Sequence, residues 1–192
     1  MEALRAVIAE DEPLTRTLIR ARLEKLGHVV VAEAGDGMQA IEAARLHRPD
    51  VIIMDIKMPL VDGIEAARTI LGETPCAILF LSAFNESELI EEAGATGALA
   101  YLMKPFRKED LGPAVHMAVG RFRQIHDQQT EIDGLRETLE TRKLLERAKG
   151  ILMDRHGMSE EEAFKRIHFQ ARNQNKKMRE IAQSIITASD LI

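Results

Sequence analysis

The chain has 192 residues, of which 45% are hydrophobic, and a formal net charge of −5. This is enough to bury the core of one domain of ordinary size and of a small second one. A single cysteine, Cys76, excludes an internal disulfide framework and fits a reducing cytosol. No secretory segment precedes the first predicted strand and no apolar run approaches the roughly 18 residues of a membrane span. We therefore expect a cytoplasmic protein without a membrane partner.

Short apolar runs alternate with helical patterns over the first hundred residues. Strands are predicted near residues 5–10, 28–33, 50–55, 77–82 and 98–102, and helices near residues 14–26, 37–47, 63–71 and 86–94. Continuous apolar runs are typical of parallel strands that are buried on both faces. The alternation predicts an α/β fold with a doubly wound, five-stranded parallel sheet of the flavodoxin-like kind.

Acidic side chains follow two of these predicted strands. Glu10, Asp11 and Glu12 follow the first strand, and Asp55 closes the third. Ligands of open α/β sheets bind beyond the carboxyl ends of the strands, so we expect these carboxylates to crowd one edge. Crowded carboxylates repel one another unless a divalent cation neutralises them. Mg²⁺ accepts one or two carboxylates and keeps waters or phosphate oxygens, so the pattern predicts a site for a phosphoryl group.

Two further strand ends supply groups that bind phosphoryl oxygens. The fourth predicted strand ends in Ser82, and the fifth ends in Lys104 followed by Pro105. A hydroxyl and an ammonium group both suit phosphoryl oxygens. Taken singly, these motifs are often only a solvated loop acid, a turn or a helix cap. Together and in this order they resemble the receiver domain of two-component response regulators, which we expect over residues 1–122.

The resemblance implies a role for each acidic position. Asp55 would be the phosphoacceptor for a sensor histidine kinase and, with Asp11, a direct Mg²⁺ ligand. Glu10 would bind the metal through water, and the backbone carbonyl of Lys57 would complete the protein's ligands. The protein would be a signalling protein, with no catalysis beyond its own phosphotransfer and dephosphorylation. A haloacid-dehalogenase-type phosphatase instead expects an Asp-x-Asp pair on the first strand, where this chain has Glu10-Asp11-Glu12.

The resemblance also assigns the residues around the phosphoryl group. Ser82 and Lys104 would hold its oxygens, Tyr101 would change rotamer when the serine moves, and the bond from Lys104 to Pro105 would be cis. A cis X-Pro bond costs only about 0.5–1 kcal/mol relative to trans.

Two side chains are predicted to control the lifetime of the phosphorylated state. Lys57 and Phe84 lie two residues after Asp55 and Ser82, at positions that flank the path of the attacking water in receivers. A long stem and an aromatic ring would shield the acyl phosphate, so we expect slow self-dephosphorylation.

After Phe106 the pattern is helical throughout. The last receiver helix is predicted to continue as a linker over residues 112–145, with apolar residues at coiled-coil spacing at Phe122, Ile125, Ile132 and Leu139. Gln129 and Arg136 occupy the intervening core positions, which weakens this seam. Isolated helices need packing to persist, so we expect a partner helix in a homodimer. The alternative is a single helix that folds back on its own receiver.

The C-terminal part of the chain is basic. Residues 142–180 carry 11 Lys and Arg against 6 Asp and Glu, a charge of +5 within a chain of net charge −5. The stretch 172–179 has four cations, no acid and three amides that can hydrogen-bond base edges. Nucleic acid is the partner that this pattern favours, although a charge run is often only a solvated face.

Three short helices are predicted within residues 142–192. The first stops at Gly157, the second begins at Ser159 with a capping box to Glu162, and the third follows Asn175. Their predicted apolar faces contain Ala163, Phe164, Ile167 and Ala171 in the second helix and Met178, Ile181, Ala182 and Ile185 in the third. The pattern Ala148-Lys149-Gly150, Leu152-Met153, Ala163 and Ile181-Ala182 resembles the ANTAR domain of transcription antitermination regulators.

That second resemblance implies that the C-terminal domain binds RNA hairpins in a nascent transcript and prevents formation of a terminator, and that phosphorylation promotes the dimer. Because the chain has one Tyr and no Trp, we expect little aromatic stacking. Met153 is expected to pack inside the domain. The predicted RNA-binding residues, with Gly150 allowing close approach, are Arg147, Lys149, Gly150, Arg172, Asn175, Lys176 and Lys177.

Two other outputs stay open at this point. A DNA-binding regulator would use residues 157–159 as the turn of a helix-turn-helix, but the helix after Ser159 begins with three glutamates that phosphates would repel. A protein-interaction module would expose a helical face to a partner and bind no nucleic acid.

Overall fold

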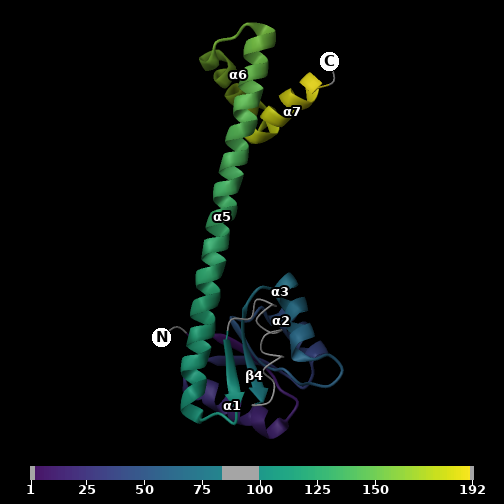
Figure 1. Ribbon diagram of the computed structural model, residues 1–192, viewed down its shortest axis with the longest axis vertical. Helices are drawn as coiled ribbons and strands as arrows, with labels where there is room; N and C mark the ends of the chain where they lie inside the picture. The colour runs from purple at the N-terminus through teal and green to yellow at the C-terminus, as the bar shows by residue number, and fades with distance from the viewer. Residues whose placement is uncertain (1–2, 84–99, 191–192) are drawn as a thin grey trace. The chain divides into compact units, whose positions relative to one another are not determined.

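The computed structural model describes residues 3–83 and 100–190 (Figure 1). The chain divides into two compact units, residues 1–126 and residues 127–192. The elements of the first unit, in chain order, are β1 (Arg5–Ala9), α1 (Pro13–Lys25), β2 (Val29–Ala34), α2 (Gly37–His47), β3 (Val51–Asp55), α3 (Gly63–Glu73), β4 (Ala77–Ala83), β5 (Ala100–Lys104) and the start of α5 (Lys108–His156). The predicted helix at residues 86–94 lies outside the described residues.

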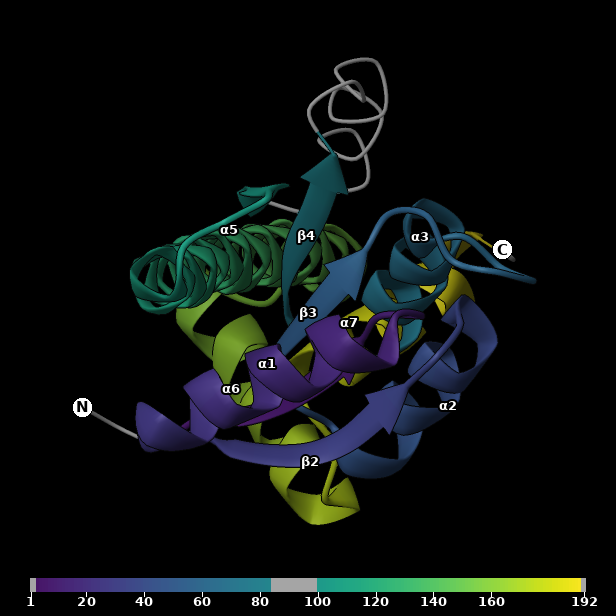
Figure 2. The same ribbon diagram turned by 90° about the horizontal axis from the view of Figure 1, so that it is seen from below.

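The five strands form one parallel sheet in the order β2-β1-β3-β4-β5. One face packs against α2 and α3, and the other packs against α1 and the first turns of α5 (Figure 2). The central run of β3, residues 51–54, has no exposed surface, because both faces of the sheet are covered. The predicted doubly wound α/β fold is therefore confirmed, with the described strands starting and ending within two residues of the predicted bounds.

Helix α5 runs without a break from Lys108 to His156. The predicted linker and the first predicted helix of the C-terminal domain are thus parts of one element. Pro113 lies inside this helix, where its ring removes the hydrogen bond that a backbone N–H would donate to Glu109 O. Of the predicted seam, Ile125, Ile132 and Leu139 are 45%, 43% and 58% exposed, so the described part of one chain covers these apolar side chains only in part.

The second unit packs the end of α5 against α6 (Glu160–Gln174) and α7 (Met178–Asp190). Its buried core consists of Ala148, Leu152, Ala163, Ile167, Ala171, Ile181, Ala182 and Ile186. The predicted end of the first helix and start of the second are confirmed: Gly157 has φ +61° and donates its N–H to Met153 O at 3.0 Å, and Ser159 and Glu162 form the capping box. Asn175 ends α6 in the left-handed conformation.

Two residues predicted to pack inside this unit are exposed instead. Phe164 is 47% exposed and Met153 is 39% exposed. Ala163, Ile167 and Ala171 are spaced by four and form the buried stripe of α6. Phe164 follows Ala163 directly, so it lies about 100° around the helix axis from that stripe.

Among the described helices, none combines the length and the apolar character that crossing a bilayer requires.

Candidate functional site

Three carboxylates meet at the carboxyl edge of the sheet. Oxygen atoms of Glu10, Asp11 and Asp55 all lie within 4.8 Å of one another. Strands β1 and β3 are neighbours with Ala9 opposite Met54, so the residues that follow in each strand arrive side by side. Glu10 is 1% exposed and Asp55 is 8% exposed, which makes the concentration of negative charge costly without a counterion.

Lys104, at the end of β5, provides that counterion. Its Nζ donates to Glu10 Oε2 at 2.7 Å and to Asp55 Oδ2 at 2.8 Å. Burial lowers the pKa of Lys104, but its hydrogen bonds to Asp55 and Glu10 outweigh that effect and raise the pKa overall. Burial raises the pKa of Glu10, against the lowering effect of the lysine. The lysine is therefore a fixed cation between two acids from different strands.

The other predicted phosphoryl-binding residues lie on β4 and β5. Ser82 is completely buried near the end of β4, one residue after the partner of Asp55 in the sheet, and its Oγ–H donates to Ala83 O at 3.2 Å. Tyr101 is 56% exposed on β5. The bond from Lys104 to Pro105 is cis, as predicted.

The structure describes only one of the two residues that are predicted to shield the acyl phosphate. Lys57 is exposed two residues after Asp55. Phe84 lies outside the described residues.

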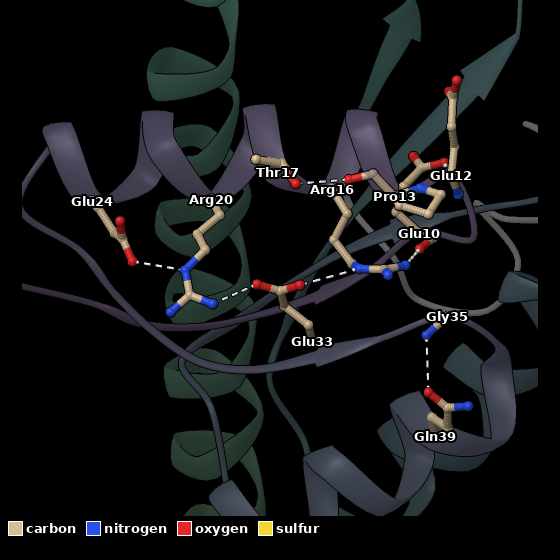
Figure 3. A network of polar contacts seen from close by, with 10 residues as sticks. All are labelled: Glu10, Glu12, Pro13, Arg16, Thr17, Arg20, Glu24, Glu33, Gly35 and Gln39. Carbon is tan, nitrogen blue, oxygen red and sulfur yellow. Dashed lines mark hydrogen bonds and ion pairs between the residues drawn. The ribbon is translucent and has the colours of Figure 1, made fainter.

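Arg16 holds the backbone of the acidic edge, and sequence reasoning missed it (Figure 3). Its guanidinium donates to the carbonyl oxygen of Glu10, and its Nε lies 3.1 Å from Glu33 Oε2 on β2. Arg20 binds the other oxygen of Glu33 at 2.6 Å. The partners of Arg16 lie 6 and 17 residues away, in the loop after β1 and on β2, so no local pattern indicated this role.

Gly63 is a second residue whose importance only the fold reveals. An ideal Cβ built on it would lie 2.1 Å from the carbonyl oxygen of Asp55, and its N–H donates to Ile56 O at 2.8 Å. Asp62 caps the same end of α3 by accepting from Glu65 N at 2.8 Å. The start of α3 is therefore pressed against the backbone of the predicted phosphoacceptor, with no room for a side chain.

A second group of candidate residues lies on the C-terminal unit. The predicted RNA-binding residues that are exposed are Arg147, Arg172, Asn175, Lys176 and Lys177. A hollow of about 480 Å³ lies where α6 turns into α7, and all of these residues except Arg147 line it. The structure therefore gathers three cations and an amide at one turn.

Lys149 and Gly150 are placed differently from those exposed cations. The Lys149 side chain is only 10% exposed, and its Nζ lies 2.7 Å from Glu160 Oε1 and 2.9 Å from Glu146 Oε1. Hydrogen bonds to Glu160 and Glu146 raise the pKa of Lys149. Its ion pair with Glu160 links the end of α5 to the start of α6, and the two glutamates already neutralise its positive charge. A Cβ on Gly150 would meet no atom within 4 Å, so no neighbour in the described chain requires a glycine there.

Comparison with known protein families identifies both parts of the chain. The response regulator receiver domain family matches residues 6–116, and the ANTAR domain family matches residues 133–186. The chain belongs to the response regulators. It is a response regulator with a receiver domain and an ANTAR output domain, and this confirms the two resemblances seen in the sequence.

Two curated relatives show how far the likeness of this response regulator extends. It is 47% identical to the transcriptional regulatory protein PdtaR of Mycobacterium tuberculosis over 182 residues, which cover 95% of this chain and 89% of that protein. It is 42% identical to a protein-glutamate methylesterase/protein-glutamine glutaminase of Natronomonas pharaonis over 109 residues, only 31% of that protein. The first likeness includes both domains.

Solved receiver structures resemble the first part of the response regulator. The signal receiver domain of the putative response regulator NarL from Mycobacterium tuberculosis is 33% identical, with a TM-score of 0.58, and covers 62% of this chain and 98% of that one. The receiver domain of sensor histidine kinase PA1611 from Pseudomonas aeruginosa is 32% identical, with a TM-score of 0.56, and covers 62% and 99%. That structure has a magnesium ion coordinated in its active site cleft.

Proposed function

We propose that this response regulator accepts a phosphoryl group on Asp55 from a sensor histidine kinase, and that phosphorylation promotes a homodimer whose ANTAR domains bind hairpin RNA and control transcription termination. The observation that carries the proposal is the placement of Asp55. It is almost fully buried among two further acids, with the Lys104 ammonium 2.8 Å away. Receiver and ANTAR domains in one chain support the coupling of this site to an RNA output.

The phosphotransfer itself needs little from the protein beyond positioning and charge. An Asp55 carboxylate oxygen forms the new bond to phosphorus, and the phosphorus–nitrogen bond to the donor histidine breaks with its electron pair left on the imidazole. Lys104 then exchanges a carboxylate oxygen of Asp55 for a phosphoryl oxygen, and the hydroxyl of Ser82 donates to another. The domain bounds proposed for these roles are residues 1–122 for the receiver, 112–145 for the helical linker and 142–192 for the output domain.

The carboxylate cluster fits Mg²⁺. Its oxygens come from three side chains that lie within 4.8 Å of one another, and hard oxygen donors are what this ion prefers. We assign Asp11 and Asp55 as direct ligands, Glu10 as a ligand through water and the Lys57 carbonyl as the fourth contribution. The ion would neutralise the charge that the phosphoryl oxygens bring to the acids.

The phosphoacceptor is tested with a small-molecule donor. Acetyl phosphate and Mg²⁺ are expected to add one phosphoryl group to the native chain, measured by phosphate-affinity electrophoresis and intact mass. Asp55→Asn is expected to block the addition, whereas Asp154→Asn, at an exposed acid in the other unit, leaves it unchanged. Addition to the Asp55→Asn variant would contradict the assignment.

The RNA output is tested by comparing ligands for the phosphorylated full-length protein. We expect it to bind a tandem-hairpin RNA more tightly than the same sequence as duplex DNA or a scrambled RNA, because its exposed cations lie beside amides that can reach unstacked bases. Tighter binding to the DNA would favour a DNA-binding regulator. Equal weak binding to all three would favour a protein-interaction output.

A further inference from the structure

Helix α6 carries an aromatic surface that the packing of its own domain leaves uncovered. Phe164 is 47% exposed and Phe169 is 61% exposed. His168 stacks on Phe164, with ring centroids 6.4 Å apart and planes inclined by 18°. Large apolar rings gathered at one exposed place commonly mark a binding site.

These rings line a hollow of about 770 Å³ at the start of α6. Met158 and both phenylalanines give it apolar walls, and Lys165 and Arg166 bring positive charge to it. Lys165 is engaged by Glu161 at 2.6 Å, whereas Arg166 is exposed and forms no hydrogen bond or ion pair within the described part of the chain. Glu162, the one acid in the lining, is held by the capping box.

The aromatic hollow adjoins the cationic hollow at the turn into α7. His168 lines both of them. Phe164 and Arg172 are eight residues apart on the same helix, which separates them by about 12 Å along its axis. Residues 163–179 supply most of the lining of the two hollows and contain six Lys and Arg and no acid. A ligand with flat apolar groups joined by negative charges matches this surface, and a single-stranded nucleic acid is such a ligand.

We propose that Phe164, His168 and Phe169 form a stacking platform for unpaired bases of an RNA loop, while Arg172 and Lys176 bind the neighbouring phosphates. The proposal rests on the RNA binding proposed above and deepens it. It differs from the expectation of little aromatic stacking, which counted Tyr and Trp and placed Phe164 inside the domain. Bases stack on phenylalanine without regard to sequence, so the platform would supply affinity for loops, and the amides at the turn would supply selectivity.

The test uses a hairpin RNA whose loop contains only adenines, one of them replaced by fluorescent 2-aminopurine, and the same stem as a duplex without a loop. Stacking on the full-length protein is expected to change the 2-aminopurine emission. The double variant Phe164→Ala, Phe169→Ala should lose this change and bind the hairpin at least about five-fold more weakly. The double variant to Tyr should retain both, because the rings remain. Leu46→Ala removes a 78% exposed side chain from α2 and serves as the matched control.

Salt dependence separates stacking from charge. The alanine variant should keep the native slope of log affinity against log salt, since it removes no cation. The double variant Arg172→Gln, Lys176→Gln should reduce the slope by about 0.7 for each phosphate that the variant no longer neutralises, and it should keep the emission change. Neither phenylalanine belongs to the buried core of the second unit, so thermal melting of the alanine variant should match that of the native chain.

Each contrary result has its own meaning. If the native chain binds neither RNA, the RNA-binding function and the platform both fail. If it binds the hairpin and the alanine variant binds equally tightly with the same emission change, only the platform is overturned. If the alanine variant loses self-association and keeps its RNA affinity, the rings form a protein contact and the platform is likewise overturned.

Discussion

Lys104 has two acids to neutralise and one ammonium group with which to do it. Its Nζ contacts Glu10 and Asp55 at 2.7 and 2.8 Å, in the place where Mg²⁺ is proposed to act on the same carboxylates. In the unphosphorylated protein, the Lys104 ammonium and a bound Mg²⁺ would therefore compete for the same carboxylate oxygens. Phosphorylation would remove the competition, because the added oxygens give the lysine a new partner.

Lys104→Gln is expected to make the receiver depend on magnesium. Without Mg²⁺ the free energy of unfolding should fall by about 1–3 kcal/mol, because two buried acids lose their counterion. Millimolar Mg²⁺ should stabilise the variant more than the native chain, since no lysine opposes binding. Urea unfolding with and without Mg²⁺ measures both effects, with the exposed Lys108→Gln as control. An equal gain from Mg²⁺ in both proteins would contradict this.

Gly63→Ala tests the close approach of α3 to the phosphoacceptor. The new Cβ would lie 2.1 Å from Asp55 O, so we expect a loss of more than about 1 kcal/mol of unfolding free energy and slower phosphorylation. Gly72→Ala, on the same helix with no atom within 4 Å, should be neutral or stabilising by up to about 1 kcal/mol.

The measurement uses the single cysteine of the chain. Cys76 is 2% exposed, and burial raises the pKa of its thiol to about 12, so a thiol reagent labels it only when the first unit opens. Faster labelling of Gly63→Ala than of Gly72→Ala is the expected result. Equal labelling rates would show that the backbone accommodates the methyl group.

At the scale of the element, helix α6 shows local and tertiary signals together. Its beginning is specified by neighbours in the sequence, because Ser159 and Glu162 bond each other's backbone N–H groups at 3.3 and 2.8 Å. Its buried stripe is specified by Ala163, Ile167 and Ala171. The prediction placed both Ala163 and Phe164 inside. The rotation of the helix about its axis buries Ala163 and leaves the ring of Phe164 exposed.

Ser159→Ala is expected to destabilise the second unit by about 1 kcal/mol through loss of the cap. Hydrogen–deuterium exchange of the amides of α6 and α7 should then be about five-fold faster. Ser184→Ala, which removes an exposed hydroxyl bonded to Glu180 O within α7, is the matched control and should change little. Equal exchange rates in the two variants would count against the cap.

Lowering the pH should reduce the difference in the stability of the second unit between the native chain and Ser159→Ala. Hydrogen bonds from the backbone and side chain of Ser159 lower the pKa of Glu162 below its usual 4.5. A lowered pKa stabilises the folded state above pH 4.5, and this contribution is lost as the pH falls through the folded-state pKa. A difference that grew below pH 4.5 would contradict the capping role of the glutamate.

At the scale of the whole molecule, the two units share one helix. Within α5 the apolar side chains of Ile132, Leu135 and Leu139 are 43%, 60% and 58% exposed and follow the 3-4 spacing of a coiled-coil seam. Leu135 was absent from the predicted seam. It directly precedes Arg136, which the prediction placed in the core between Ile132 and Leu139. Exposing such a row of apolar residues to water is unfavourable, so covering the row with a second helix would lower the free energy.

The double variant Ile132→Asp, Leu139→Asp is expected to remain monomeric after treatment with acetyl phosphate and Mg²⁺, while the native chain dimerises. Two carboxylates in the seam would lose their water and repel their counterparts. Light scattering measures the state, and electrophoresis confirms that phosphorylation still occurs. Leu46→Asp, at an exposed position on α2, should dimerise normally. Dimers of the double variant would place the interface elsewhere.

The sequence by itself determined the fold class, the helix boundaries at Gly157 and Ser159, and which strand ends carry reactive side chains. These features depend on periodicity and local hydrogen bonds, which neighbours in the chain encode. Only the tertiary structure decided that Arg16 holds the backbone of Glu10, that Gly63 leaves no room beside Asp55, and that Lys149 is used in an ion pair.

The same division explains the exposed rings of Phe164 and Phe169. Composition counts aromatic residues, but a ring is available to a ligand only if packing leaves it outside, and packing depends on contacts between residues far apart in the chain. The buried stripe of α6 meets Ala148 on α5 and Ala182 on α7. That three-way contact fixed the rotation of the helix, and with it the face that the domain presents.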